Sequence, residues 1–208
     1  MSLTTFVTFV LISAAQVAAP GPSTVFLVNN AIIYSPRRAI VALSGDLAAI
    51  IILASLSAVG VGALLAANTV LFTALRIAGA VYLLWLGFGY LRSHNTAAGG
   101  DSREAAMTGA SFSLWLQSFW IGISNPKAVL FFAALFPQFI PADSGYGLLA
   151  ILVIGFVLTK LVVLGGYALA ARQLRRVFAT EGNVAFGRRL TGALFILFGC
   201  AMVWPLVT

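Results

Sequence analysis

The chain has very few charged residues, since only 8% of its 208 residues are Asp, Glu, Lys or Arg. Soluble domains carry about 25%, so this chain has too few polar side chains to cover a surface exposed to water. A soluble enzyme, a nucleic-acid-binding domain and a disordered regulator are therefore excluded. Apolar residues make up 61% of the chain and the mean hydropathy is +1.05, which indicates a membrane protein.

Side chains that bind metals or catalyse reactions are also scarce. The single cysteine, Cys200, lies within an apolar run, so the sequence has neither a disulfide framework nor a Cys/His metal cluster. The single histidine, His94, lies in a polar connection and is expected to be a solvated loop residue. We therefore expect no catalytic residues, no metal, no cofactor and no nucleic-acid partner.

Six stretches are long and apolar enough to cross a membrane as helices, because about 20 helical residues span the hydrocarbon core. We expect the first stretch to be retained and not cleaved as a signal peptide, since no Lys or Arg precedes Arg37. The predicted fold class is an all-α membrane protein with six transmembrane helices in one transporter domain, residues 1–208. The predicted spans are 3–34, 39–66, 69–91, 110–137, 146–170 and 190–207.

The distribution of basic residues predicts how the spans are oriented. The connections at 67–68 and 138–145 contain no Lys or Arg, whereas the connections after the odd-numbered spans are rich in Arg. The positive-inside rule therefore places the odd connections in the cytoplasm and both termini outside. The arginines in these odd-numbered connections are Arg37, Arg38, Arg92, Arg103, Arg172, Arg175, Arg176, Arg188 and Arg189.

The chain also divides into two similar repeats of three spans, 1–92 and 109–208, joined by a cytoplasmic linker, 93–108. The first span of each repeat is interrupted, at Pro20-Gly21-Pro22 and at Asn125-Pro126-Lys127. Because three is odd, the repeats would enter the membrane from opposite sides. We predict two inverted three-helix repeats with helices 1 and 4 broken at proline, while a chance match of proline spacing is the alternative.

The two interruptions are the candidate binding site. Proline is favoured at the first position of a helix, so each interruption predicts a cap, Gly21 or Asn125, followed by a new half-helix. In inverted repeats both half-helices direct their amino termini toward the middle of the bilayer, where a carboxylate would bind. Lys127 adds a full positive charge there, although two simple kinks would give the same pattern. The candidate substrate-binding residues are Pro20, Gly21, Pro22, Ser23, Asn29, Asn125, Pro126 and Lys127.

Asp46 is the only acidic residue within a predicted span, where an unpaired charge costs a few kcal/mol or more. We expect its side chain to face the bundle, because its helical face holds mostly small residues. One interpretation is a structural ion pair with Lys160 or Lys127. The other is a carboxylate that binds an ammonium group or takes up a proton, and the two are compatible. Arg76, near the outer end of the third span, is expected to be an interface anchor.

Several segments resemble the LysE/RhtB family of amino-acid exporters, of the homoserine, threonine and lysine efflux type. The resemblance covers nearly the whole chain in the correct order. It implies a six-span inner-membrane protein that exports amino acids in exchange for protons, with its broken helices at the two interruptions and its intramembrane acid at Asp46. The matching segments are Pro20-Gly21-Pro22, Gly45-Asp46, RIAGAVYLLWLG (76–87), NPKAVLFF (125–132), FPQF (136–139) and LTGALF (190–195).

We therefore predict a secondary active exporter of small neutral amino acids or their derivatives, driven by proton antiport. The cargo carboxylate would bind at the half-helix termini and Lys127, and its ammonium at Asp46, where protons from outside would compete. A single intramembrane acid disfavours dibasic cargo. The expected partners are an amino acid, protons and the lipid bilayer, and a homodimer is left open. The alternatives are a passive channel or an exporter of another small solute or cation.

Overall fold

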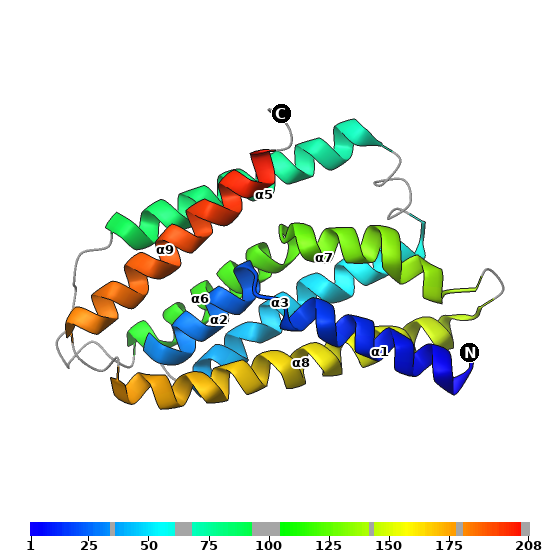
Figure 1. The fold of residues 1–208 in the computed structure, drawn as a ribbon, viewed down its shortest axis with the longest axis horizontal. Helices are drawn as coiled ribbons and strands as arrows, with labels where there is room; N and C mark the ends of the chain where they lie inside the picture. Colours follow the sequence, from blue (N-terminus) through cyan, green and yellow to red (C-terminus); the bar gives the residue numbers. More distant parts are fainter. Residues whose placement is uncertain (34–35, 61–67, 93–104, 142–143, 178–180, 205–208) are drawn as a thin grey trace.

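The structure is a computed structural model that describes residues 1–33, 36–60, 68–92, 105–141, 144–177 and 181–204 (Figure 1). These described residues form helices and contain no strand. The helices are α1 (Leu3–Ala18), α2 (Pro22–Ile33), α3 (Pro36–Ala58), α5 (Thr69–Arg92), α6 (Ala105–Ile123), α7 (Pro126–Leu130), the π-helix η1 (Phe131–Leu135), the 3₁₀-helix η2 (Phe136–Phe139), α8 (Tyr146–Val177) and α9 (Glu181–Val203).

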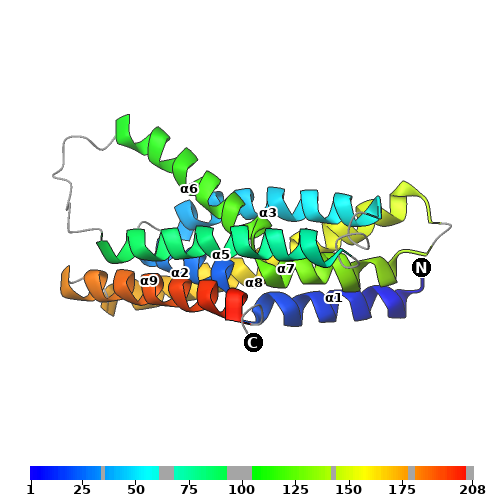
Figure 2. The ribbon, with the colours of Figure 1, turned by 90° about the horizontal axis from the view of Figure 1, so that it is seen from above.

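The helices run roughly along one axis, and their ends alternate between the two ends of the molecule (Figure 1). α2 ends and α3 begins at one end, where α5 and α8 also end. α1 begins at the opposite end, where α3 ends and α5 begins. The helix ends at the positions predicted to be cytoplasmic thus lie together. The amino-terminal part of α6 leans away from the other helices (Figure 2).

Three continuous helices are long and apolar enough to cross a membrane, namely Arg38–Ala58, Thr69–Arg92 and Tyr146–Ala171. Two further helix pairs qualify as bent spans, in which the two halves form angles of 63° and 48°. The apolar part of α9, Arg189–Val203, is shorter than a full span. The chain is thus a multi-pass helical membrane protein with both predicted interruptions, whereas the count of six crossings stays a prediction.

One predicted boundary was wrong, and another is only partly within the described residues. The second span was predicted to extend to residue 66, but α3 ends at Ala58 and Gly60 follows with a φ of 84°, a left-handed conformation that glycine adopts without strain. The linker was predicted to comprise residues 93–108, and α6 begins within this range, at Ala105. Residues 61–67 and 93–104 lie outside the described residues, so the remainder of these two predictions is not tested.

The helices pack in pairs that surround the two interruptions. α5 packs along α9, α3 packs along α6, and α8 packs against both α1 and α2. The α5–α9 pair approaches closely at Gly87 and Gly192, because a Cβ on either glycine would lie 2.8 Å from the backbone oxygen of the other. α2 contacts α3, α8, α6 and α9, so the helix that begins at the first interruption lies at the centre of the bundle.

Candidate functional site

The first interruption separates α1 from α2 at Pro20-Gly21-Pro22. Proline has no backbone N–H, so Pro20 and Pro22 cannot continue the hydrogen-bond pattern of α1. The Gly21 carbonyl accepts a hydrogen bond from the Val25 N–H at 3.0 Å, which starts the new helix with Pro22 at its first position. The chain turns by 63° here, as the sequence predicted.

The second interruption separates α6 from α7 and is capped by a side chain. The Asn125 Oδ1 accepts a hydrogen bond from the Lys127 N–H at 3.1 Å, and Pro126 occupies the first turn of α7. This is the capping arrangement that the sequence predicted. The helix continues from α7 through η1, where the Ser57 hydroxyl donates a hydrogen bond to the Phe132 carbonyl. A π-helix commonly marks a functional site.

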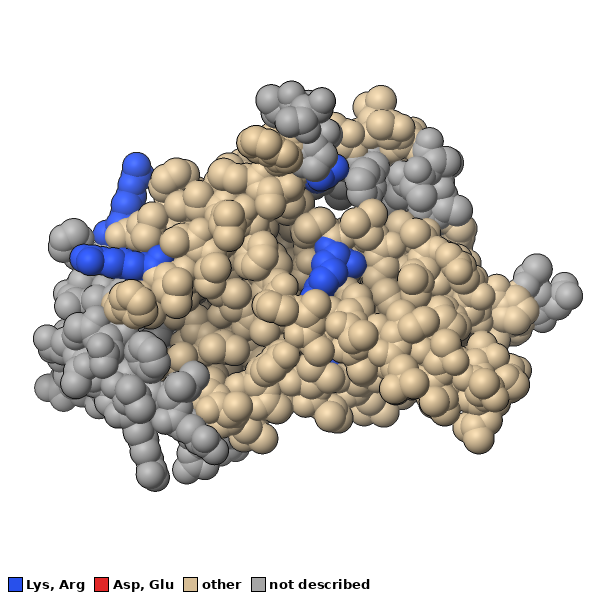
Figure 3. All heavy atoms as spheres, in the orientation of Figure 1, with Lys and Arg blue, Asp and Glu red and all other residues tan. Residues whose placement is uncertain are grey.

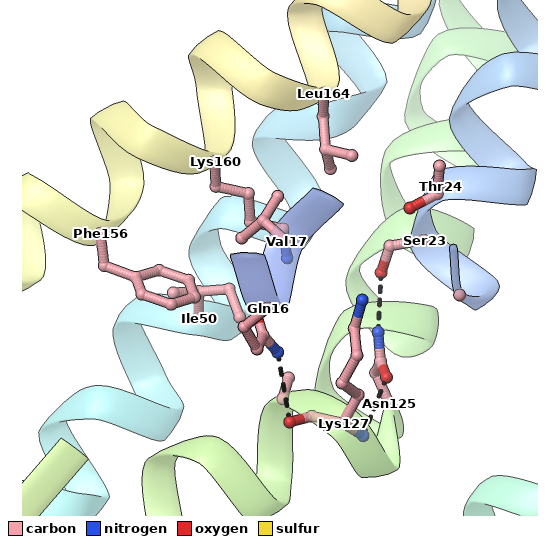
Figure 4. Close-up of a pocket in the computed structure, with 12 residues that line it drawn as sticks. Gln16, Val17, Ser23, Thr24, Ile50, Asn125, Lys127, Phe156, Lys160 and Leu164 are labelled. Carbon is pink, nitrogen blue, oxygen red and sulfur yellow. Dashed lines mark hydrogen bonds between the residues drawn. The ribbon is translucent and has the colours of Figure 1, made fainter. Parts of the chain in front are cut away.

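The two interruptions lie against each other. The Asn125 Nδ2 donates a hydrogen bond to the Ser23 Oγ at 3.2 Å, and the Gln16 Nε2 donates one to the Lys127 carbonyl at 3.2 Å (Figure 4). The Lys127 ammonium also donates a hydrogen bond to the Ala19 carbonyl. The structure therefore brings residues about a hundred positions apart in the sequence into one polar cluster.

Lys127 lies between helix ends of opposite polarity. The last carbonyls of α1 carry partial negative charge, and two of them are satisfied from other helices. The Tyr167 hydroxyl of α8 donates to the Ala18 carbonyl at 2.8 Å, while Lys127 donates to Ala19. The Nζ of Lys127 also lies next to Gly21, since a Cβ on Gly21 would be 3.5 Å from it, an ordinary contact distance.

Asp46 lies directly behind this cluster, on α3. Its side chain is almost completely buried, with 1% of its surface exposed, and its Oδ2 is 2.7 Å from the Nζ of Lys160 on α8. The Ser23 hydroxyl donates to Asp46 Oδ1 at 3.4 Å, which links the carboxylate to the first interruption. Gly122 of α6 packs so closely that a Cβ there would overlap with Oδ1. A buried charge of this kind needs such a partner.

Two hollows meet at the interruptions. The smaller one, about 10 Å³, has room for roughly one water molecule and is lined by Ser23, Asn125, Lys127 and Lys160 among others (Figure 4). The larger one, about 320 Å³, lies between both interruptions and the α5–α9 pair. Gly21, Asn125 and Lys127 line both. The described residues that line the two hollows include no acidic side chain. On the face of the molecule drawn in Figure 3, the charged side chains that are visible among the described residues are all basic.

Most of the predicted binding residues line these hollows. Ser23 lines the smaller one, whereas Asn29 is buried on α2 and lines neither. The Asn29 Nδ2 has no hydrogen-bond partner among the described residues. Asp46 also lines neither hollow, because Ser23 and Lys160 stand between it and the smaller one. The residues that line the larger hollow are Pro20, Gly21, Pro22, Asn125, Pro126 and Lys127.

Sequence reasoning missed three contributors to the site. Arg76 was interpreted as an interface anchor, but it lines the larger hollow. Tyr167 and Gly122 were not considered as site residues, yet Tyr167 caps α1 and Gly122 makes room for Asp46. A signal for Arg76 existed, since an arginine inside a span is costly and usually faces a cavity. Gly122 had no local signal, because its role depends on the neighbouring helix.

A bundle of apolar helices in which two broken spans meet at a hollow lined by basic side chains is typical of a membrane transport protein. The chain belongs to the LysE type translocator family, whose family model matches residues 14–204. Members of this family are transporters, so the chain is a transporter and not an enzyme, as predicted. The resemblance seen in the sequence motifs is thereby confirmed.

Similar proteins include the homoserine/homoserine lactone efflux protein of Salmonella typhimurium, which is 29% identical over 93% of each chain. The leucine efflux protein of Klebsiella pneumoniae is 28% identical over 90% of this chain and 91% of its own. The threonine efflux protein of Escherichia coli is 25% identical over 95% of this chain and 97% of its own. No solved structure matches the chain.

Proposed function

We propose that the protein exports small neutral amino acids or their derivatives across the inner membrane in exchange for protons. The similar proteins are named as efflux proteins for homoserine and its lactone, leucine and threonine, which supports amino-acid export. The observation that carries the proposal is the convergence of both broken helices, Lys127 and the Asp46–Lys160 pair at one place.

The cargo carboxylate binds at Lys127 and the start of α2. The first turn of a helix presents unpaired N–H groups and partial positive charge, which favours an anion. In the described state the Lys127 ammonium donates to the Ala19 carbonyl, so it is already held at the wall of both hollows. A carboxylate arriving in the larger hollow meets this ammonium without any rearrangement of the backbone.

The cargo ammonium binds toward Asp46 by displacing Lys160. Lys160 occupies the carboxylate in this structure, and the path to it passes Ser23 and the smaller hollow. A cargo ammonium that takes the place of Lys160 keeps the buried carboxylate paired, which avoids the cost of leaving it alone. Lys160 and the cargo ammonium thus compete for the same carboxylate in this scheme.

Competition between a proton and the cargo ammonium for Asp46 couples the proton flux to the cargo flux. A proton that binds to Asp46 from outside removes the negative charge that holds the cargo ammonium, so cargo is released on that side. Loss of the proton to the cytoplasm restores the carboxylate for the next cargo molecule. Proton binding and cargo binding exclude each other in this scheme, which is the requirement for antiport and not for symport.

The proposed architecture is a single domain of two inverted repeats with both termini outside. In support, the packing partners correspond between the halves: α3 packs on the broken helix of the second half, and α8 packs on the broken helix of the first. α5 and α9, the third helices of each half, pack on each other. Arg38 and Arg92 belong to helix ends at the end of the molecule that is predicted to be cytoplasmic.

Flux measurements on variants in which Asp46 and Lys160 are replaced by neutral residues test this function. The purified full-length chain is reconstituted in vesicles, and amino-acid counterflow is driven by a pH gradient. Asp46→Asn should abolish the proton-driven component. The double variant Asp46→Asn/Lys160→Gln should still exchange cargo for cargo, at a reduced rate, and should not respond to the pH gradient.

The double variant shows whether the Asp46–Lys160 pair couples protons to cargo or only stabilises the fold. If the pair only stabilises the fold, two neutral partners of similar size satisfy each other, and the double variant transports with full proton coupling. Proton-coupled flux that is unchanged in Asp46→Asn would remove Asp46 from the scheme. Melting curves in detergent verify that each variant is folded before its flux is compared.

A further inference from the structure

The larger hollow has two chemically different sides. One side consists of the interruptions with Lys127, and the other is formed by the α5–α9 pair and Leu130 of α7. The second side is apolar except for one residue, Arg76 of α5. Its apolar members are Leu130, Phe198, Ala201 and Met202.

Arg76 has no ion pair and no hydrogen bond to its side chain among the described residues. Its side chain is half-buried, and it lies seven residues after the start of α5, within a span. A guanidinium without a partner at such a position is costly in a membrane protein. The cost is offset when an anion regularly occupies the hollow.

We propose that Arg76 and Lys127 hold the cargo carboxylate between them, and that the apolar wall of α5 and α9 receives an aliphatic side chain. This inference rests on the proposed amino-acid export and specifies its cargo class. The preferred cargo is an aliphatic amino acid of about the size of leucine, ahead of hydroxylated, acidic or dibasic amino acids.

The chemistry of each side supports this class. A guanidinium binds a carboxylate through two parallel N–H groups, whereas an ammonium acts as a point charge, so the two together fix both position and orientation. A carboxylate held between them leaves the cargo side chain against Phe198 and Met202. A hydroxyl at that wall would lose its hydrogen bonds to water, and a second ammonium would meet two cations.

The position of Asp46 fits the same orientation. Gly21, Asn125 and Lys127 separate the larger hollow from the smaller one, and Ser23 links the smaller one to Asp46. Cargo bound at this boundary directs its ammonium toward Asp46 and its side chain toward α5 and α9. The three groups on the α-carbon of an amino acid thus each have a matching surface.

Transport kinetics of Arg76 variants test this inference. Vesicles with the full chain are assayed with leucine, threonine, lysine and leucinamide, which lacks the carboxylate. Arg76→Gln should raise the KM for leucine roughly tenfold to a hundredfold, with a smaller change in kcat. Arg76→Lys should recover part of the affinity for leucine. The wild-type preference for leucine over leucinamide should become smaller in Arg76→Gln.

The matched control is Arg189→Gln, because Arg189 is an exposed arginine of α9 that does not line the hollow.

The apolar wall is tested by Met202→Thr, which should lower the ratio of leucine to threonine transport at least severalfold.

An unchanged KM for leucine and an unchanged preference for leucine over leucinamide in folded Arg76→Gln would overturn the role of Arg76. Wild-type protein that transports lysine or threonine better than leucine would overturn the cargo class. Failure of the proposed function is distinguishable from both, because the wild-type vesicles would then transport none of the amino acids.

Discussion

The position of Asp46 depends on neighbouring residues with small side chains or none. Gly122 lies against the carboxylate, and Ala49 and Ala42 on the same helix face as Asp46 are buried. Small residues let α3 and α6 approach closely, as they do at many helix contacts in membranes. The ion pair with Lys160 therefore forms in a space from which other side chains are excluded.

Gly122→Ala is expected to destabilise the protein by about 1–3 kcal/mol, because the added methyl group overlaps with Asp46 Oδ1 and the surrounding helices must shift. Thermal unfolding in detergent measures this change. The matched control is Gly89→Ala in α5, where a Cβ would meet no atom within 4 Å, and its stability should be unchanged or slightly higher. Equal melting temperatures for the two variants would show that Gly122 does not confine Asp46.

Single residues were predictable from the sequence only where their type alone is unusual. Asp46 and Lys127 stand out because charges are costly in a span, and Lys160 was one of two candidate partners for Asp46. The choice between the two depends on how α8 rotates about its axis. That rotation is set by contacts with other helices and has no local signal.

At the scale of helices, the two interruptions start their new helices with different kinds of cap. The first starts α2 with a backbone cap at Gly21, whereas the second starts α7 with the Asn125 side chain. Asn125 also donates to Ser23, so this one side chain both caps a helix and joins the two interruptions. Loss of Asn125 therefore affects the geometry of the site as well as the stability of α7.

Asn125→Ala is expected to cost about 0.5–2 kcal/mol of stability through the lost cap, and to lower amino-acid flux severalfold at cargo concentrations below KM. Asn68→Ala is the control, because the Asn68 Oδ1 accepts from the Leu71 N–H at 3.0 Å at the exposed start of α5. That variant should lose a similar cap and keep its flux. If both variants lose flux equally, the loss reflects stability and not the site.

Both interruptions were predictable, because proline cannot continue a helix and the asparagine before Pro126 has a side chain that favours a helix cap. The π-helix after α7 was not predictable. It depends on the long-range hydrogen bond from Ser57 to Phe132 and on the surrounding phenylalanines, whose rings pack at centroid distances of 4.9–5.2 Å around Phe131, Phe132 and Phe156. The end of α3 was predicted too late, because the prediction followed the apolar run, which continues past Gly60.

At the scale of the whole molecule, the bundle encloses a cationic site within an apolar protein. The site has one buried carboxylate, Asp46, which pairs with Lys160, while Lys127 and Arg76 line the larger hollow, so positive charge is in excess among these described residues. An exporter of cations would require the opposite balance. The all-helical class was predictable from composition, whereas the pairing of α5 with α9 required the structure.

Accumulation of cargo against its gradient distinguishes proton-driven export from a passive pore. Vesicles containing the wild-type chain are loaded with labelled leucine at the same concentration inside and outside, and a pH gradient is then imposed. We expect saturable net movement of leucine that makes the two concentrations unequal. This movement should be opposite in direction to the proton flux and should stop when the pH gradient is collapsed. Leucine that stays at equal concentrations on both sides, or that moves in the same direction as the protons, would contradict it.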